Sequence, residues 1–160
     1  DNEIPSAEYF HELKRVSKNQ IIWGGNYFNL PIQRGWIFWD KDIRDGLSFS
    51  DGELAWTNFD RVLKRCFIPY SGFRGADNGG KIHPTQKPRA LYQWLLTNYA
   101  EPNFKILDTH LGSGSIAIAV DSVNKIEKMN LTLTACELDT EYYQTATQRI
   151  KEQTTWNSLF

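Results

Sequence analysis

The sequence has few of the features that mark secreted, metal-binding or membrane proteins. Its 160 residues include only two cysteines, Cys66 and Cys136, with no CxxC pair and no Cys/His cluster. We therefore expect no zinc site and no disulfide framework, and we predict two buried thiols in a reducing, cytoplasmic compartment. The apolar stretches are far shorter than the roughly 20 residues that cross a bilayer. The first residues do not resemble a signal peptide, and there is no initiator methionine, so Asp1 need not be the natural start.

Charge of one sign is also lacking, because the formal net charge is −1 at pH 7. A chain of this kind does not bind nucleic acid through bulk positive charge. The distribution differs from the total: residues 1–60 carry 6 Lys/Arg and 10 Asp/Glu (net −4), residues 61–105 carry 8 and 2 (net +6), and residues 106–160 carry 4 and 7 (net −3). The middle of the chain is therefore basic.

What is present indicates one globular α/β domain, since 41% of the residues are hydrophobic and 14% are aromatic. Apolar spacing predicts helices at 6–17, from about 88 to 99, at 116–123 and at 140–151, and strands at 21–23, 36–39, 54–59, 62–70, 105–108 and 131–136. Asp139 is placed to cap the last helix, which should bury Tyr143, Ala146 and Ile150. Strands that alternate with helices predict a mostly parallel sheet covered on both faces.

The sharpest chemical pattern lies in residues 105–137, where a strand, a glycine turn, a helix and a second strand end at Glu137. Helix N-termini present free N–H groups, and Gly112 and Gly114 let a ligand approach the backbone closely. Glu137 is placed to bind ribose hydroxyls. This pattern allows both a nicotinamide enzyme and an S-adenosylmethionine enzyme. Asp108 favours the second, because its carboxylate would repel a pyrophosphate but would suit an ammonium group.

Three segments carry a family resemblance. Residues 108–115, D-T-H-L-G-S-G-S, resemble the D-P-F-x-G-S-G-T motif of DNA amino-methyltransferases. Residues 83–88, H-P-T-Q-K-P, resemble the H-P-T-Q-K-P segment of the same family. Residues 137–143, E-L-D-T-E-Y-Y, resemble the family's E-L-D-P-E-Y-Y segment. The hexapeptide precedes the glycine turn, which resembles the permuted, β-class motif order. The resemblance implies a Rossmann-like S-adenosylmethionine-dependent methyltransferase fold.

Carried over residue by residue, the resemblance implies that Asp108 and Gly112 lie against the methionine part of S-adenosylmethionine. Thr85 and Lys87 would lie near its carboxylate, and Glu137 would take the ribose hydroxyls. His83, Ser113 and Gly114 complete the implied cofactor site as members of the same motifs. Thr109 and His110 replace the family's proline and aromatic residue, and we expect His110 to be a packed or polar-turn residue rather than a catalytic base. No metal is expected.

The family's catalytic D/N/S-P-P-Y/F/W loop is missing, since the chain has no Pro-Pro pair. In the β-class order this loop would stand before Asp1. We therefore interpret the chain as one methyltransferase domain incomplete at its N-terminus: residues 1–60 are the catalytic-side half without its first strand and loop, 61–82 a target-recognition segment and 83–160 the cofactor-binding half. No catalytic residue is assigned within the chain.

The basic segment 61–82 is the expected DNA-binding region, with Arg61, Arg65, Arg74 and Lys81 interleaved with aromatic residues. A strand with solvated cations and core aromatics is the alternative. The expected partner is double-stranded DNA with the target base flipped out. The segment is short, which suggests either modest recognition or recognition assisted by a homodimer.

The leading interpretation is thus a DNA methyltransferase of restriction-modification, orphan or phage type, in a bacterial or phage-infected cell, with adenine favoured over cytosine. A catalytically inert cofactor- or DNA-binding fragment is the second hypothesis. A nicotinamide-dependent oxidoreductase is the third, and it leaves the hexapeptide unexplained.

Overall fold

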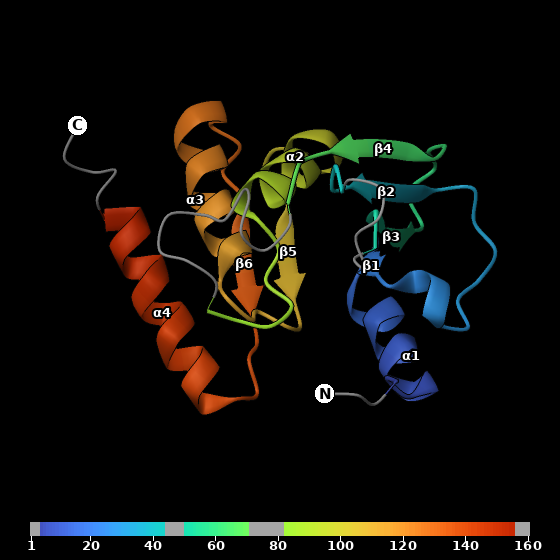
Figure 1. Cartoon of the computed structure of the whole chain (residues 1–160), viewed down its shortest axis with the longest axis horizontal. Coiled ribbons are helices and arrows are strands. Elements are labelled where there is room, and N and C mark those ends of the chain that lie inside the picture. Colours follow the sequence, from blue (N-terminus) through green and yellow to red (C-terminus); the bar gives the residue numbers. More distant parts are fainter. Residues whose placement is uncertain (1–3, 44–49, 71–81, 156–160) are drawn as a thin grey trace. The chain divides into compact units, whose positions relative to one another are not determined.

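The computed structural model describes residues 4–43, 50–70 and 82–155. The chain forms two compact units, Asp1–Ser71 and Gly72–Phe160, and each has its own sheet (Figure 1). The two units are described separately below.

The first unit begins with helix α1, Ala7–Val16, whose N-cap is Ser6. The hydroxyl of Ser6 accepts a hydrogen bond from the backbone N–H of Tyr9 (3.3 Å), which satisfies one of the free N–H groups of the first turn. Strand β1, Ile21–Trp23, follows and leads through Gly24, which has a left-handed φ of 69°, into the 3-10 turn η1, Gly25–Tyr27. The predicted helix, strand and tight turn are all found.

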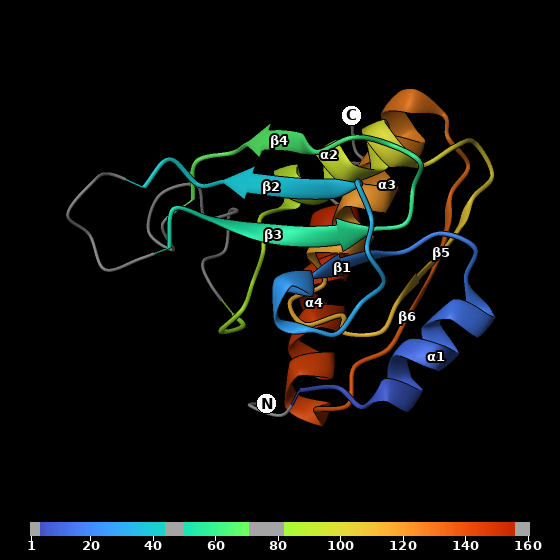
Figure 2. The same ribbon diagram turned by 90° about the vertical axis from the view of Figure 1, so that its right-hand side faces the viewer.

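The sheet of the first unit contains β2, Trp36–Asp40; β3, Gly52–Thr57; and β4, Lys64–Phe67, in the order β1-β3-β2-β4 (Figure 2). Strand β3 pairs antiparallel with both β1 and β2, whereas β4 pairs parallel with β2. Two tryptophans fix the core of this unit: Trp39 and Trp56 are 1% and 2% exposed, and their indole N–H groups donate to the carbonyls of Ile68 (2.9 Å) and Pro31 (2.8 Å). Each ring is thus buried with its polar atom satisfied.

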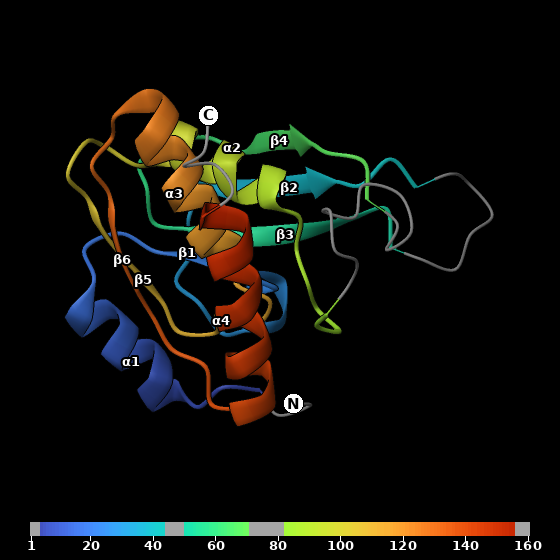
Figure 3. The same ribbon diagram turned by 90° about the vertical axis from the view of Figure 1, so that its left-hand side faces the viewer.

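The second unit contains α2, Arg89–Tyr99; β5, Lys105–Asp108; α3, Ser115–Glu127; β6, Thr132–Ala135; and α4, Thr140–Thr155. Strands β5 and β6 are parallel and in register from Lys105–Thr132 to Asp108–Ala135. One buried cluster joins α2, α3 and the segment before β6 through Leu96, Ala119, Val120, Val123 and Leu131. Helix α4 packs beside α3 (Figure 3). The sheet and helices together place the carboxyl ends of two parallel strands next to the N-terminus of α3.

The mostly parallel sheet predicted from the sequence is not confirmed. The described strands form a mixed sheet in the first unit and a parallel pair in the second. Antiparallel neighbours need no helical crossover, and β3 follows β2 directly in the order of elements, so the alternation of strands and helices is a guide to the second unit only. None of the described helices is long and apolar enough to cross a membrane.

Two predictions of buried side chains were wrong. Cys66 is fully buried, but Cys136 is exposed, because alternation along β6 places it on the same exposed face as Thr132 and Thr134. Tyr143 is 52% exposed, whereas Ala146 is fully buried. Successive side chains turn about 100° around a helix, and the neighbouring Tyr142 takes the inward position in the first turn of α4.

Candidate functional site

The candidate site lies where β5 and β6 end. The backbone N–H of Cys136 donates to the carbonyl of Asp108 (2.9 Å), and that of Leu111 donates to the carbonyl of Cys136 (2.8 Å). These bonds extend the pairing beyond the last registered pair, Asp108 and Ala135. Because both strands run in the same direction, Asp108, the glycine turn and Glu137 are brought to one edge of the sheet. Ligands bind at this edge in open parallel sheets.

The glycine turn requires its two glycines. Gly112 and Gly114 have left-handed φ values of 53° and 75°. Gly114 is the N-cap of α3, and its N–H closes the turn by donating to the carbonyl of Leu111 (3.0 Å). A Cβ on Gly114 would lie 2.7 Å from Cδ1 of Ile150, so that side of the turn is filled by α4.

Glu137 joins the end of β6 to this turn. Its Oε2 accepts a hydrogen bond from the backbone N–H of Gly112 (2.8 Å), and its Oε1 accepts one from the N–H of Asp139 (3.1 Å). A carboxylate has about four acceptor positions on its two oxygens. Glu137 therefore fixes the turn and keeps acceptor capacity for further donors such as hydroxyl groups.

The H-P-T-Q-K-P segment packs against the same turn through His83. A Cβ on Gly112 would be 3.6 Å from ring atoms of His83, which is ordinary van der Waals contact, and the His83 ring lies 4.4 Å from the ring of Tyr142 in a T-shaped arrangement. Thr85 is tied to the same imidazole, since its backbone N–H and hydroxyl lie 3.3 and 3.1 Å from Nδ1 of His83. Three motifs that are far apart in the sequence thus meet at Gly112.

Asp108 is the most perturbed acid of the site. Burial raises the pKa of its carboxyl above the ordinary range, and the charge of Glu137 adds to this. The backbone N–H of His110, which donates to Oδ1 at 3.0 Å, and the charges of His110 and Lys87 lower the pKa of Asp108 again. Lys87 is therefore close enough to Asp108 for its charge to lower the pKa of that carboxyl. Asp108 is partly buried, and a carboxylate in such a place gains from a cationic ligand group.

Of the residues predicted for the cofactor, His83, Thr85, Lys87, Asp108, Gly112, Gly114 and Glu137 are brought together in the second unit. Ser113 is 4% exposed, with its hydroxyl 3.1 Å from that of Ser115, so it belongs to the buried side of the turn. The hydroxyl of Thr109 lies 3.0 Å from Nδ1 of the exposed His110, consistent with a polar turn. Their roles in binding remain predictions.

Two residues that contact the turn, Tyr142 and Arg149, were not predicted from the sequence to belong to the site. Nη1 of Arg149 donates to the carbonyl of Ser113 (2.7 Å) and to the hydroxyl of Ser115 (3.1 Å). Tyr142, Ala146 and Arg149 follow one another at spacings of four and three residues, which is one face of a helix. This periodicity could have placed both residues toward the turn, but a cation was not expected on a buried face.

The predicted DNA-binding residues are only partly described. Arg61 is exposed just before β4. Arg65 lies on β4, pairs with the carboxylate of Asp40 (2.6 Å) and lies over the ring of Phe67 (5.3 Å to the centroid). Arg74 and Lys81 lie outside the described residues. The exposed cations beside β4 therefore belong to the first unit, and their role in DNA binding remains a prediction.

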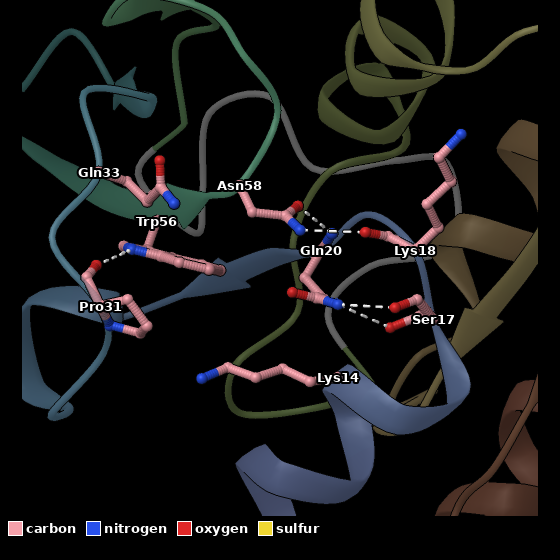
Figure 4. A pocket seen from close by; sticks show the side chains of 8 residues that line it. All are labelled: Lys14, Ser17, Lys18, Gln20, Pro31, Gln33, Trp56 and Asn58. Atoms are coloured by element: carbon pink, nitrogen blue, oxygen red, sulfur yellow. Dashed lines mark hydrogen bonds between the residues drawn. The ribbon is translucent and has the colours of Figure 1, made fainter.

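The first unit also contains a cavity of about 240 Å³ that no motif predicted (Figure 4). Its polar lining groups bond mainly to one another: Gln20 Nε2 donates to the carbonyl of Ser17 (2.9 Å), and Asn58 Nδ2 to the carbonyl of Lys18 (3.0 Å). The cavity holds none of the predicted site residues. Among the described residues there is also no cluster of three or more His, Cys, Asp or Glu that could hold a metal ion.

Comparison with known proteins identifies the family. The family model described as DNA methylase, N6_N4_Mtase, matches residues 9–148. This match covers most of the chain, and the protein therefore belongs to this DNA methylase family.

Solved structures share the fold. The first is the M1.HpyAVI complex with S-adenosylmethionine, which is 18% identical in sequence and has a TM-score of 0.65. The alignment covers 92% of the present chain and 83% of the M1.HpyAVI chain. The second is TTHA0409, described as a DNA modification methylase from Thermus thermophilus complexed with S-adenosyl-L-methionine, which is 16% identical and has a TM-score of 0.46. The alignment covers 74% of the present chain and 53% of the TTHA0409 chain. At this identity the first likeness shows a common fold, and the second carries no further weight.

Proposed function

We propose that the protein is part of an S-adenosylmethionine-dependent DNA methyltransferase that modifies an exocyclic amino group, with adenine as the expected base. The observation that carries this proposal is the meeting of three motifs at Gly112. His83 contacts the glycine turn, Glu137 bonds to its N–H at 2.8 Å, and Asp108 ends the adjoining strand. Family membership and the S-adenosylmethionine complex of M1.HpyAVI support the same function.

The groups at this edge fit the chemistry of the proposed cofactor. The carboxylate of Asp108 suits the ammonium group of the methionine part, and the remaining acceptor positions of Glu137 suit ribose hydroxyls. Lys87 and the hydroxyl of Thr85 suit the methionine carboxylate. The cofactor, when bound, supplies an electrophilic methyl group. The residues of this edge bind and orient it, and the step that activates the target amino group is assigned to a D/N/S-P-P-Y/F/W loop not found in this sequence.

On the DNA side, we propose that the exposed cations around β4 contact phosphates and that the target base is flipped out of the duplex. A base inside a duplex cannot present its amino group to an enclosed site, which supports flipping. Arg61 and Arg65 are exposed, and Arg74 and Lys81 would extend the same basic segment. A homodimer would supply a second copy of this short segment. Restriction-modification, orphan and phage enzymes all remain suitable settings.

The second candidate is an inert fragment that binds cofactor or DNA without transferring a methyl group. The observation that favours it is the absence of any Pro-Pro pair in the sequence. A catalytic loop supplied by another part of the full protein would instead make this chain part of an active enzyme.

Methyl transfer separates the two candidates. The protein encoded by the natural gene is incubated with tritiated S-adenosylmethionine and unmethylated DNA, and the DNA is digested to nucleosides. We expect label in N6-methyladenine, and no transfer by residues 1–160 alone. Label in N4-methylcytosine would overturn the choice of base. Absence of transfer by the natural protein, with cofactor binding intact, would favour the inert fragment.

A further inference from the structure

Helix α4 supplies a buried cation behind the glycine turn. Arg149 is 7% exposed, and its Nη1 donates to the carbonyl of Ser113 (2.7 Å) and the hydroxyl of Ser115 (3.1 Å). These acceptors are 36 and 34 residues earlier in the chain, on either side of Gly114. Arg149 is thus a long-range polar link between the end of the chain and the turn.

The rest of this interface is apolar and close. A Cβ on Gly114 would lie 2.7 and 2.9 Å from two atoms of Ile150 and 3.5 Å from Cβ of Ala146. Ser113 and Ser115 are buried at 4% and 2% exposure. The turn therefore rests on one face of α4, and its backbone conformation depends on that face.

The position of Arg149 opposes helix stability. Its guanidinium is bonded at the first residue of α3, where the helix dipole is positive and a cation is unfavourable. Burying a guanidinium also costs free energy unless its hydrogen bonds are made. An anionic group bound at the N-terminus of α3 would attract the guanidinium and make the position of Arg149 favourable.

We propose that Arg149 is a positioning residue for the cofactor: it holds residues 112–115 in the binding conformation and adds positive charge toward the carboxylate of the methionine part. This inference rests on the proposed function. The bond to the Ser113 carbonyl also polarises the peptide whose N–H, that of Gly114, closes the turn on Leu111 at 3.0 Å. The effect of Arg149 should therefore reach the ligand through the turn and through charge, without direct contact.

The test compares two ligands by calorimetry on the full chain. S-Adenosylhomocysteine carries the amino-acid part, and 5′-methylthioadenosine lacks it. Arg149→Met should weaken S-adenosylhomocysteine binding about 10-fold, because the ligand must then order a turn that has lost about one buried charged hydrogen bond, and should change methylthioadenosine binding less than about 2-fold. Arg149→Lys, which keeps the charge, should recover part of the loss. Lys151→Met, on an exposed position of the same helix, is the matched control and should bind both ligands as the wild type does.

Hydrogen exchange of the ligand-free protein provides the second readout. Arg149→Lys should increase amide exchange at residues 112–115 while leaving exchange in α2 unchanged. Equal weakening of both ligands by Arg149→Lys, or unchanged affinity and exchange, would overturn the positioning role. Failure of the wild type to bind S-adenosylhomocysteine at all would instead overturn the proposed function, so the two failures are distinguishable.

Discussion

At the scale of single residues, the partly buried carboxyl of Asp108 links the stability of the protein to pH. Burial raises the pKa of its carboxyl, so the folded state holds this proton to a higher pH than the unfolded state does. Its contribution to stability is complete below the unfolded pKa and is lost as the pH rises through the folded pKa. At pH values above the folded pKa, the partly buried carboxylate of Asp108 costs stability, and a cationic partner would reduce that cost.

The Asp108→Asn substitution removes this charge and tests both its cost in stability and its proposed role in binding. Asp108→Asn should raise the Tm at pH 8, with the difference from the wild type shrinking as the pH falls toward 4. The same change should weaken S-adenosylmethionine binding about 10-fold or more, because a charged hydrogen bond to its ammonium group is lost. Thermal melts across pH and calorimetry check both effects, with the exposed Asp51→Asn as the control. A lower Tm at pH 8 would contradict the burial of charge at Asp108.

The two cysteines give a second test at this scale. Burial raises the pKa of Cys66 to about 11, and its thiol is inaccessible, whereas Cys136 is exposed beside Glu137. A thiol reagent at pH 8 should modify Cys136 alone in the folded chain and both thiols in denaturant, as mass spectrometry would show. S-Adenosylmethionine should slow the reaction of Cys136 several-fold. Unchanged reactivity with saturating ligand would place the cofactor away from the end of β6.

At the scale of elements, short-range patterns predicted most of the secondary structure. Asp139 caps α4 as expected, since its Oδ1 accepts hydrogen bonds from the N–H groups of Glu141 and Tyr142, both at 2.9 Å. Such patterns are local and are readable in the sequence. The mixed sheet and the contact of His83 with Gly112 depend on long-range packing, which local patterns do not encode. The sequence predicted which segments form the site, whereas the structure shows which atoms join them.

The glycine turn gives a paired prediction for this scale. Gly112→Ala and Gly114→Ala both place a side chain at a left-handed φ, which costs about 1 to 2 kcal/mol. Gly114→Ala also forces Cβ to 2.7 Å from Ile150, and such overpacking adds about 1 to 3 kcal/mol. Urea unfolding should therefore show the larger loss for Gly114→Ala. Equal losses would show that α4 does not fill the space behind the turn.

At the scale of the whole molecule, the near-neutral net charge is the sum of acidic and basic segments. The acidic residues of the candidate site, Asp108 and Glu137, belong to the second unit, and the exposed cations Arg61 and Arg65 belong to the first. This difference in charge between segments can be counted from the sequence, because the net charge of a segment is the sum over its residues. The sequence could not show that Arg65 is paired with Asp40 at 2.6 Å, since that contact joins two strands.

The DNA side of the proposal is tested by salt dependence. Each phosphate contact contributes a slope of about −0.9 to the plot of log K against log salt concentration. The Arg61→Ala and Arg65→Ala changes should each reduce the slope by about 1 for duplex DNA, measured by fluorescence anisotropy. Lys125→Ala is the matched control, because Lys125, like Arg65, is an exposed cation paired with a carboxylate, that of Asp121 at 2.8 Å, but lies outside the basic segment. Slopes unchanged by both arginine substitutions would remove β4 from the DNA interface.

We propose that S-adenosylmethionine binds at the carboxyl ends of β5 and β6, and a calorimetric titration measures this binding. The chain is titrated with S-adenosylmethionine and, separately, with NAD. We predict saturable binding of S-adenosylmethionine at one site per chain, lost or strongly weakened in Glu137→Ala, and no heat from NAD. Binding of NAD with no signal from S-adenosylmethionine would contradict the claim.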